Sequence, residues 1–240
     1  MERHDTAGGP TAPSVLEFER TGLPLSDDGN DEMFIDLTVG RGELVLIDPG
    51  DDLHERVLAD GACGLVSPTS GAVRFLGRDW TEMPPDQANA LRGRIGHVFR
   101  FGEWVPYLSM EDNVLLAPLH HTGRPRAEIR EEAARLAVQF GLPGLPVRLP
   151  SELSSRDRRR AAYIRAFLGT PELIVIESPR MGLVVELMAP LINAIRRARD
   201  RDAAVLWFMH ENRLWFEPSV PATGRVCLRG REIVAVGDDR

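Results

Sequence analysis

The chain has 240 residues and a formal net charge of −7, from 29 basic and 36 acidic residues. This length is sufficient for one domain with a sizeable core, and the acidic charge argues against a protein that coats nucleic acid. Every basic residue is Arg, and the absence of Lys excludes enzymes that need a lysine amine and phosphate-binding loops that need a lysine charge. The two cysteines, Cys63 and Cys227, lie far apart in the sequence, which favours a reducing compartment and no disulfide framework.

The first hundred residues are predicted to form mainly strands. Residues 1–13 contain no apolar run, so we expect a flexible tail there and not a signal peptide. Alternating apolar and polar residues predict strands over Val15–Glu19 and Met33–Val39, and the apolar run Leu44–Ile47 is typical of a buried central strand. The other elements expected in this part are a helix over Asp51–Asp60, a strand over Ala72–Leu76, a helix over Pro85–Arg92 and a strand over Ile95–Phe99.

The middle of the chain has helical patterns, and the last third returns to strands that alternate with helices. Apolar residues recur at helical spacing over Arg126–Phe140, and Ser154 with Asp157 resembles a capping box that opens the next helix. Apolar strands alternating with helices indicate an α/β fold with a parallel sheet covered on both faces. The elements expected at the end are strands at Leu173–Ile176 and Ala204–Met209, an amphipathic helix at Val184–Arg199, and a hairpin of Val226–Leu228 with Ile233–Val236.

A series of short motifs, in order along the chain, resembles the ATP-binding cassette (ABC) ATPases. The strongest stretch is Pro150–Ser154, then Arg159–Ala162, Arg165–Ala166 and Pro171–Leu173, at the spacing of the family's signature helix and following strand. The likeness runs from about Leu16 to Gly237 and is greatest to the ATPase subunit of Mla-type, Mce-associated phospholipid transporters. Weaker landmarks are Leu37-Thr38-Val39, Arg41-Gly42-Glu43, Ser70-Gly71 to Gly77, Val98-Phe99 and Asp112-Asn113-Val114.

The resemblance implies a P-loop NTPase-like parallel sheet core with an antiparallel N-terminal β part and an inserted helical subdomain. We expect one domain over 14–240, with its core in 14–100 and 169–240 and the helical subdomain in about 101–168. The resemblance also implies a membrane permease as partner, together with a second ABC-type subunit in a homo- or heterodimer. Such a subunit is expected in the cytoplasm, peripheral on the inner face of a bacterial inner membrane.

The phosphate-binding loop of the resembling family needs glycines, a Lys and a Ser or Thr, and this chain lacks them at the matching positions. Glycines let backbone N–H groups approach the phosphates, the Lys neutralises them, and the hydroxyl binds Mg²⁺. Exchanging the Lys for a carboxylate at about 4 Å from a phosphate charge changes the interaction by roughly 8 kcal/mol at an effective dielectric near 20. The matching positions hold Pro49, Asp52 and His54 for the glycines, Glu55 for the Lys and Arg56 for the Ser or Thr.

The remaining elements of the nucleotide site are altered as well. By the resemblance, Glu177 replaces the metal-binding aspartate, and Ser178 replaces the general base, a role that an unactivated hydroxyl cannot fill at neutral pH. Arg100 replaces the coupling glutamine, and His210 is the one intact match, to the switch histidine. The signature motif lacks its glycines and continues after Leu153 as Ser154, Ser155, Arg156 and Asp157.

These losses favour a catalytically degenerate subunit, a pseudo-ATPase with a structural or regulatory role on a permease in a lipid-transport-type assembly. No cofactor is expected in that interpretation. Two alternatives remain open. In the first, the chain is a functional ATP-binding subunit that uses ATP and Mg²⁺ beside an intact ATPase partner, with Ser154 closing the shared site. In the second, it is a scaffold subunit of an unrelated complex.

Three further features bear on partners and ligands. The segment Trp104, Val105, Pro106 and Tyr107 follows the position where the family receives its permease, and its aromatic residues suit a partner interface or, equally, core packing. The adjacent His120 and His121 have no acid or Cys at ligand spacing, which favours a surface loop and no metal. The arginines at 156 and 158–160 are interpreted as a solvated helix face, and no nucleic-acid partner is predicted.

Overall fold

The computed structural model describes residues 14–26, 31–178, 185–210 and 215–236, and the predicted tail over 1–13 lies outside them. Within this part of the chain, the strands form one sheet in the order β5-β4-β1-β2-β10-β9-β3-β8-β7-β6. The strands are β1 (Ser14–Pro24), β2 (Glu32–Gly40), β3 (Leu44–Asp48), β4 (Ser70–Phe75), β5 (Arg78–Asp79), β6 (Ile95–Val98), β7 (Leu173–Ile176), β8 (Ala204–Phe208), β9 (Gly224–Arg229) and β10 (Glu232–Ala235). The helices are α1 (Asp52–Ala62), α2 (Pro85–Arg92), α3 (Met110–His121), α4 (Arg126–Gln139), α5 (Ser155–Phe167) and α6 (Val185–Arg199), with short 3-10 turns at Trp80–Glu82 and Pro150–Glu152.

One half of the sheet is parallel and buried on both faces. Strands β3, β8, β7 and β6 pair in parallel, and nearly every residue in the apolar runs of β3, β7 and β8 is buried. Successive side chains of a strand point to opposite faces. Accordingly, Leu44 and Leu46 join the core with α3 to α6, and Val45 and Ile47 join the core with α1 and the N-terminal strands. The short apolar runs are therefore central strands, as predicted.

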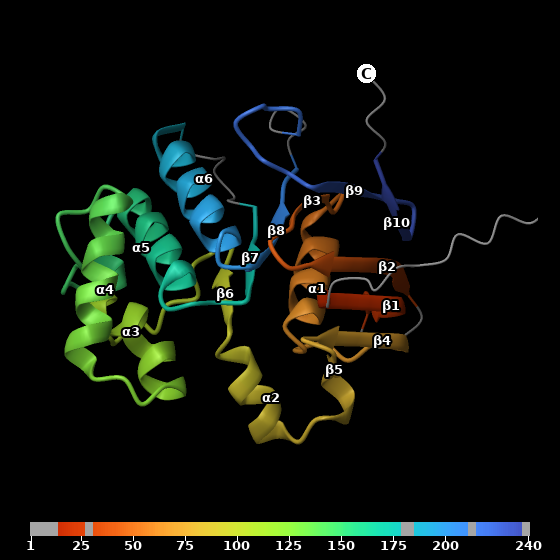
Figure 1. The fold of residues 1–240 in the computed structure, drawn as a ribbon, viewed down its shortest axis with the longest axis horizontal. Helices are drawn as coiled ribbons and strands as arrows, with labels where there is room; N and C mark the ends of the chain where they lie inside the picture. Colours follow the sequence, from red (N-terminus) through yellow and green to blue (C-terminus); the bar gives the residue numbers. More distant parts are fainter. Residues whose placement is uncertain (1–13, 27–30, 179–184, 211–214, 237–240) are drawn as a thin grey trace, which may run out of the picture.

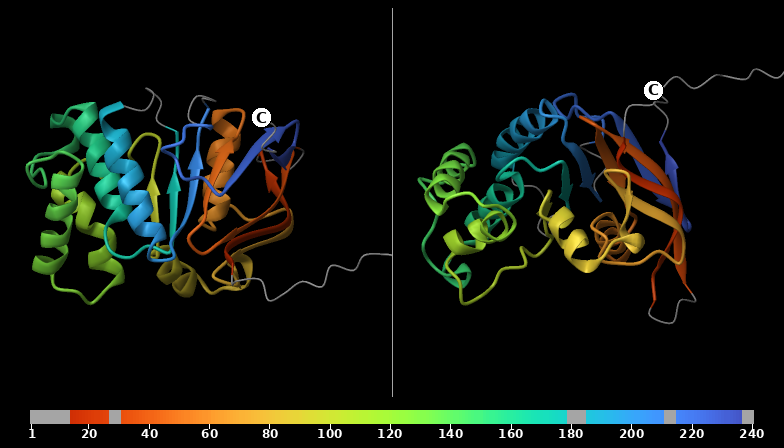
Figure 2. Two further views of the ribbon diagram at one scale, coloured as in Figure 1. Left: turned by 45° about the horizontal axis from the view of Figure 1, so that its top comes forward. Right: turned by 60° about the horizontal axis from the view of Figure 1, so that its bottom comes forward.

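The other half is largely antiparallel and curls around α1. Strand β1 pairs antiparallel with both β2 and β4, and β9 forms an antiparallel hairpin with β10. The right-hand view of Figure 2 shows α1 enclosed by these strands on one side and by the parallel strands on the other. Val57, Leu58 and Ala62 of α1 are buried in this enclosure. This packing holds the first turn of α1 at the end of β3.

Helices α3, α4 and α5 lie together on one side of the molecule (Figure 1). They share a buried core that includes Val114, Ala133 and Ile164. Helix α5 also packs closely on β6, where Gly96 is required because a Cβ there would collide with the Ala166 carbonyl oxygen. These helices fall within the predicted helical subdomain, 101–168, although the division of the chain into subdomains stays a prediction.

The sequence-based elements agree with the structure apart from their ends and one segment. Helix α2 has the predicted bounds, whereas α1 and β6 differ from expectation by one or two residues at their ends. The predicted loop at His120 and His121 is wrong, because both residues belong to the last turn of α3. That helix continues past Pro118 and ends at His121. The C-cap residue, Thr122, donates a 2.7 Å hydrogen bond from its hydroxyl to the Pro118 carbonyl oxygen.

Candidate functional site

The candidate site lies where four parallel strands end at the same edge of the sheet. Asp48 ends β3 beside the start of α1, Arg100 follows β6, Glu177 and Ser178 follow β7, and His210 follows β8. The carboxyl ends of parallel strands are the common position for a binding site in an open α/β sheet. The structure thus brings together the residues that the sequence placed at the phosphate loop, the coupling loop, the catalytic strand and the switch.

The first turn of α1 is capped by a carboxylate of the chain itself. Asp51 is the N-cap residue, and its Oδ1 accepts 3.0 Å hydrogen bonds from the N–H groups of Leu53 and His54. Partial burial acts to raise the pKa of Asp51, but the hydrogen bonds from His54 and Leu53 outweigh it and hold the pKa below its usual range. A helix N-terminus is where a phosphate would otherwise bind. Here an aspartate accepts those hydrogen bonds.

Glu55, one turn into α1, is a buried carboxylate with partners from three other segments. Its side chain is 2% exposed. Oε1 accepts a 2.6 Å hydrogen bond from the Ser178 N–H, while Oε2 lies 2.5 Å from His210 Nε2 and 3.3 Å from an Arg100 guanidinium nitrogen. Burial raises the pKa of Glu55, and its hydrogen bonds and the Arg100 charge offset part of that rise. This carboxylate joins α1 to the segments that follow β6, β7 and β8.

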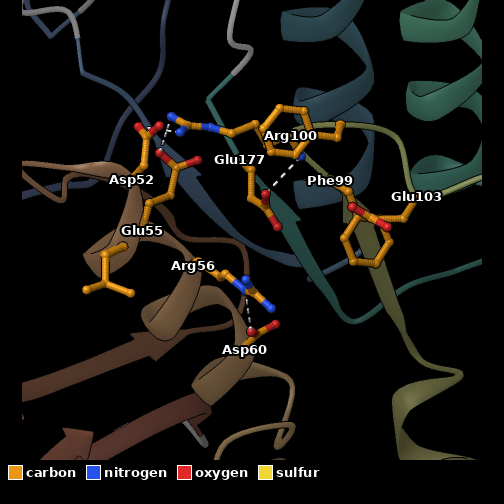
Figure 3. Close-up of a pocket in the computed structure, with 10 residues that line it drawn as sticks. Asp52, Glu55, Arg56, Asp60, Phe99, Arg100, Glu103 and Glu177 are labelled. Atoms are coloured by element: carbon orange, nitrogen blue, oxygen red, sulfur yellow. Dashed lines mark hydrogen bonds and ion pairs between the residues drawn. The ribbon is translucent and has the colours of Figure 1, made fainter. Parts of the chain in front are cut away.

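Arg100 supplies the positive charge at this edge of the sheet. Its guanidinium forms an ion pair with Asp52 and reaches Glu55 (Figure 3). It also lies 3.0 Å from His210 Nε2. The hydrogen bond to Asp52 is the main cause of a pKa above the usual arginine value. The side chain is only 10% exposed. A cation delivered from the loop after β6 therefore lies against the acidic first turn of α1.

A second buried carboxylate, Glu177, lies beside Glu55 and has partners of its own. Glu177 Oε1 is 2.7 Å from His97 Nε2, and Glu177 Oε2 accepts a 2.8 Å hydrogen bond from the Arg100 N–H. Burial acts to raise the pKa of Glu177, but the contacts with His97 and Arg100 outweigh it and hold the pKa below its usual range. Ser178 donates its hydroxyl to the Phe208 carbonyl oxygen at 2.8 Å. The Ser178 hydroxyl is thus bound to the backbone and is not activated by a base.

An acidic cleft of about 510 Å³ opens beside this network. Two arginines and five carboxylates line it, a formal excess of three negative charges that disfavours a phosphate group. Figure 3 shows Asp60 and Arg56 at one end and Phe99 and Glu103 at the other. Among the described residues, no group of three or more His, Cys, Asp or Glu side chains is arranged to hold a metal ion.

The signature positions begin α5 and lie outside this network. Ser154 is the N-cap residue, and its Oγ accepts a 3.0 Å hydrogen bond from the Asp157 N–H and donates to the Asp157 carboxylate at 2.9 Å. Ser155 is exposed, and Arg156 forms a 3.4 Å ion pair with Glu186 of α6. The predicted capping role of Ser154 is confirmed. Its hydroxyl thus both donates and accepts a hydrogen bond within the chain.

The segment Trp104–Tyr107 divides into an inward and an outward part. Trp104 packs against the helical core and lies under the Arg165 guanidinium, 4.2 Å from the ring centre. Val105 exchanges hydrogen bonds with the Asn113 side chain, at 2.8 and 3.0 Å. Tyr107, by contrast, is 80% exposed. Core packing thus explains Trp104, and the outward surface of the segment is formed by Pro106 and Tyr107.

Sequence reasoning missed three residues that complete the site. His97 has a signal in hindsight, since it alternates with buried residues in β6 and points to the same side as the Glu177 position. Arg159 belongs to the basic run that was interpreted as solvated, and for this residue the interpretation is wrong. Its guanidinium turns inward and donates to the carbonyl oxygens of Phe99 and Arg100. Arg165 donates in the same way to Gly102 and Glu103.

Comparisons with known proteins show the family of this chain. The model of the family described as "ABC transporter" matches residues 57–180. The lipoprotein-releasing system ATP-binding protein LolD of Nitratidesulfovibrio vulgaris is 32% identical over 179 residues, which cover 72% of this chain and 76% of the relative. The chain belongs to the ABC transporter family of ATP-binding subunits. The matched residues begin directly after Arg56 and so leave out the phosphate-loop positions.

Solved structures of this family share the fold. An ATP-binding subunit of an ABC transporter superposes with a TM-score of 0.79 at 19% identity, covering 94% of this chain and 91% of that one. The bacterial ABC transporter cassette MJ0796, solved as a dimer, gives a TM-score of 0.77 at 17% identity and covers 91% and 96%. The predicted ABC-ATPase fold class is therefore confirmed. No helix of this ABC subunit, within the residues described, is long and apolar enough to cross a membrane.

Proposed function

We propose that this ABC-family chain is a pseudo-ATPase: a subunit that keeps the cassette fold, binds no ATP or Mg²⁺, and serves a membrane permease as a structural or regulatory partner. The observation that carries the proposal is Glu55. A buried carboxylate stands where the family has its phosphate-binding Lys, and it is held by Arg100, His210 and the Ser178 N–H. The relatives are named ATP-binding proteins, and in this proposal the chain differs from them in its nucleotide site.

Three features of the site support the loss of nucleotide chemistry. The Asp51 carboxylate accepts hydrogen bonds from the N–H groups that would otherwise bind a phosphate. The adjoining cleft has a formal excess of negative charge, which repels a phosphate. The position of the general base holds Ser178, whose hydroxyl donates to a backbone carbonyl oxygen. Binding, charge neutralisation and water activation would each need residues that are absent from these positions.

Titration calorimetry of the full chain with Mg-ATP tests the proposal. We expect no binding tighter than a dissociation constant of about 1 mM, which corresponds to roughly −4 kcal/mol. The LolD relative, prepared in parallel, serves as the positive control. Micromolar binding together with ATP turnover by this chain would overturn the proposal.

The proposed partners are a permease and a second ABC-type subunit, at the inner face of a bacterial inner membrane. The support for a dimer is the MJ0796 cassette, which was solved as one. A lipid-transport assembly of the Mla type is supported by the sequence likeness alone. Within the segment proposed for the permease contact, Tyr107 presents the largest exposed side chain.

The alternative, a functional subunit beside an intact ATPase, makes a different prediction. In that case Ser154 would help to close the partner's site, although its hydroxyl is already bonded to Asp157. The co-purified complex of this chain with its partner subunits decides between the two. ATPase activity that is lost on Ser154→Ala would support the alternative, and activity unchanged by that substitution would support the pseudo-ATPase.

A further inference from the structure

Arg100, near the start of the loop after β6, contacts the core of the protein. The Arg100 N–H donates to Glu177, and the Arg100 guanidinium reaches Asp52 and Glu55 of α1. Glu55 is bonded in turn to the Ser178 N–H and lies 2.5 Å from His210. The side chains of Glu55 and Arg100 therefore join α1 and the ends of β6, β7 and β8 through direct contacts.

The same loop is fastened to the helical side of the molecule by two arginines of α5. Arg159 donates to the carbonyl oxygens of Phe99 and Arg100, the latter at 3.0 Å. Arg165 donates to Gly102 at 2.6 Å and to Glu103 at 3.2 Å, and its guanidinium lies between the rings of Phe99 and Trp104, 5.2 and 4.2 Å from their centres. A guanidinium over an aromatic face is attractive. Both ends of residues 99–105 are thus held.

We propose that Glu55 and Arg100 form an internal clasp that takes the place of a nucleotide and holds the loop over 99–107 in one position for a protein partner. The inference rests on the proposed function, since the partner is the permease named there. Three carboxylates surround Arg100 at this edge, those of Asp52, Glu55 and Glu177. The clasp makes the presentation of the outward side chains, Phe101 and Tyr107, independent of ATP.

The residues of the clasp are buried, whereas two side chains of the loop that it holds are exposed. Glu55 and Arg100 have side chains that are 2% and 10% exposed, so water competes little for their charges. Phe101 and Tyr107, the outward side chains of the loop that the clasp holds, are 62% and 80% exposed. A rigid loop loses less conformational entropy when a partner binds to it, which favours association. Glu55 and Arg100 are therefore positioning residues for an interface.

Hydrogen exchange of the full-length chain tests the clasp. In the wild-type protein without nucleotide, we expect the Arg100 and Val105 amides, which are bonded to Glu177 and Asn113, to exchange at least a hundredfold more slowly than free amides. Millimolar Mg-ATP should leave these rates unchanged. Rapid exchange in the nucleotide-free protein would overturn the proposal, and this measurement needs no variant.

Two variants and one control sharpen the result. Glu55→Gln and Arg100→Gln each weaken the clasp, and we expect either to speed exchange of the Arg100 amide by about tenfold or more, because opening becomes more frequent. Arg56→Ala, the next residue on α1 and 80% exposed, should leave it unchanged. Unchanged exchange in both clasp variants would overturn the proposal.

The outcomes separate this inference from the proposed function. A chain that binds and hydrolyses Mg-ATP, yet has a protected loop without nucleotide, contradicts the pseudo-ATPase and leaves the clasp intact. A chain that binds no ATP but has an unprotected loop contradicts the clasp alone. Slow exchange only in the presence of Mg-ATP contradicts both.

Discussion

Helices α1 and α5 both begin with a polar N-cap, but their first turns are embedded in different surroundings. At α1, Glu55 is buried and contacts Arg100 and His210 from two other strand ends. At α5, Arg156 is 55% exposed and forms an ion pair with Glu186 on the neighbouring helix. Both positions carry glycine-rich motifs in the resembling family. The substitution at Glu55 has become part of the protein's interior, whereas those at Ser155 and Arg156 remain on its surface.

This difference indicates which part of the proposed loss of the nucleotide site involves the protein's interior. A charged residue introduced on the surface is solvated, so replacing it again changes the stability of the protein little. A charge exchanged in the interior must be matched by partners, and here Arg100 provides the cation that the phosphate loop lacks. A Lys at position 55 would lie against the Arg100 guanidinium, so we expect that this substitution alone would not create a phosphate-binding loop.

The largest effect should come from removing the buried carboxylate at α1. Glu55→Ala leaves Arg100, His210 and the Ser178 N–H without their shared acceptor, and we expect a loss of about 3–5 kcal/mol in the free energy of unfolding. Urea denaturation at pH 7 measures it. Arg56→Ala, one residue along the same helix, is the control and should stay within about 0.5 kcal/mol. A change for Glu55→Ala as small as the control's would mean that the network contributes nothing to stability.

The second effect concerns the neighbouring Glu177–His97 pair and its dependence on pH. Glu177→Gln removes the charge and one of the two accepting oxygens, so a hydrogen bond to an ionised group is lost, at a cost of roughly 1.5–3 kcal/mol at pH 7. Because the folded-state pKa of Glu177 lies below its ordinary value of 4.5, its contribution is present above that pH and is lost as the pH falls through the lowered pKa. The stability difference between wild type and variant should therefore shrink between pH 7 and pH 3.

Glu55 has the opposite linkage, which allows an internal check. Its pKa is raised in the folded protein, so the pH-dependent part of its contribution to stability is present at low pH and is lost as the pH rises through the raised pKa. Its contacts with Arg100, His210 and the Ser178 N–H are a separate contribution, which the substitution at pH 7 measures. In a Glu55→Gln protein the acid-induced loss of stability should consequently be steeper than in the wild type. Parallel pH profiles for the Glu55 and Glu177 variants would contradict the assignment of opposite shifts.

Much of the fold follows from sequence patterns, because the central strands are apolar runs and α6 has a clear amphipathic spacing. The contrast between the two helix starts was harder to predict. A run of arginines looks the same whether it is solvated or turned inward, and only tertiary packing takes Arg159 to the carbonyl groups of Phe99 and Arg100. The link between Glu55 and Arg100 joins residues 45 positions apart and leaves no local pattern.

The two N-caps offer a smaller and more symmetrical comparison. Asp51→Ala and Ser154→Ala each remove hydrogen bonds to first-turn N–H groups, and each should cost about 1 kcal/mol. Asp51→Asn and Ser154→Thr keep an accepting oxygen and serve as matched controls, with losses of a few tenths of that. Thermal unfolding measures all four. A much larger cost at Asp51 than at Ser154 would show that its carboxylate belongs to the buried network and not only to the cap.

The smallest effect should come from the exposed ion pair at α5. Arg156 and Glu186 lie 3.4 Å apart with side chains 55% and 61% exposed, so solvent and salt screen their attraction. We expect Arg156→Ala to change the free energy of unfolding by less than about 0.5 kcal/mol, and the change to vanish in 1 M NaCl. Urea denaturation at low and high salt measures both. A loss comparable to that of Glu55→Ala would remove the contrast between the two helices, because Arg156 would then belong to a buried network of its own.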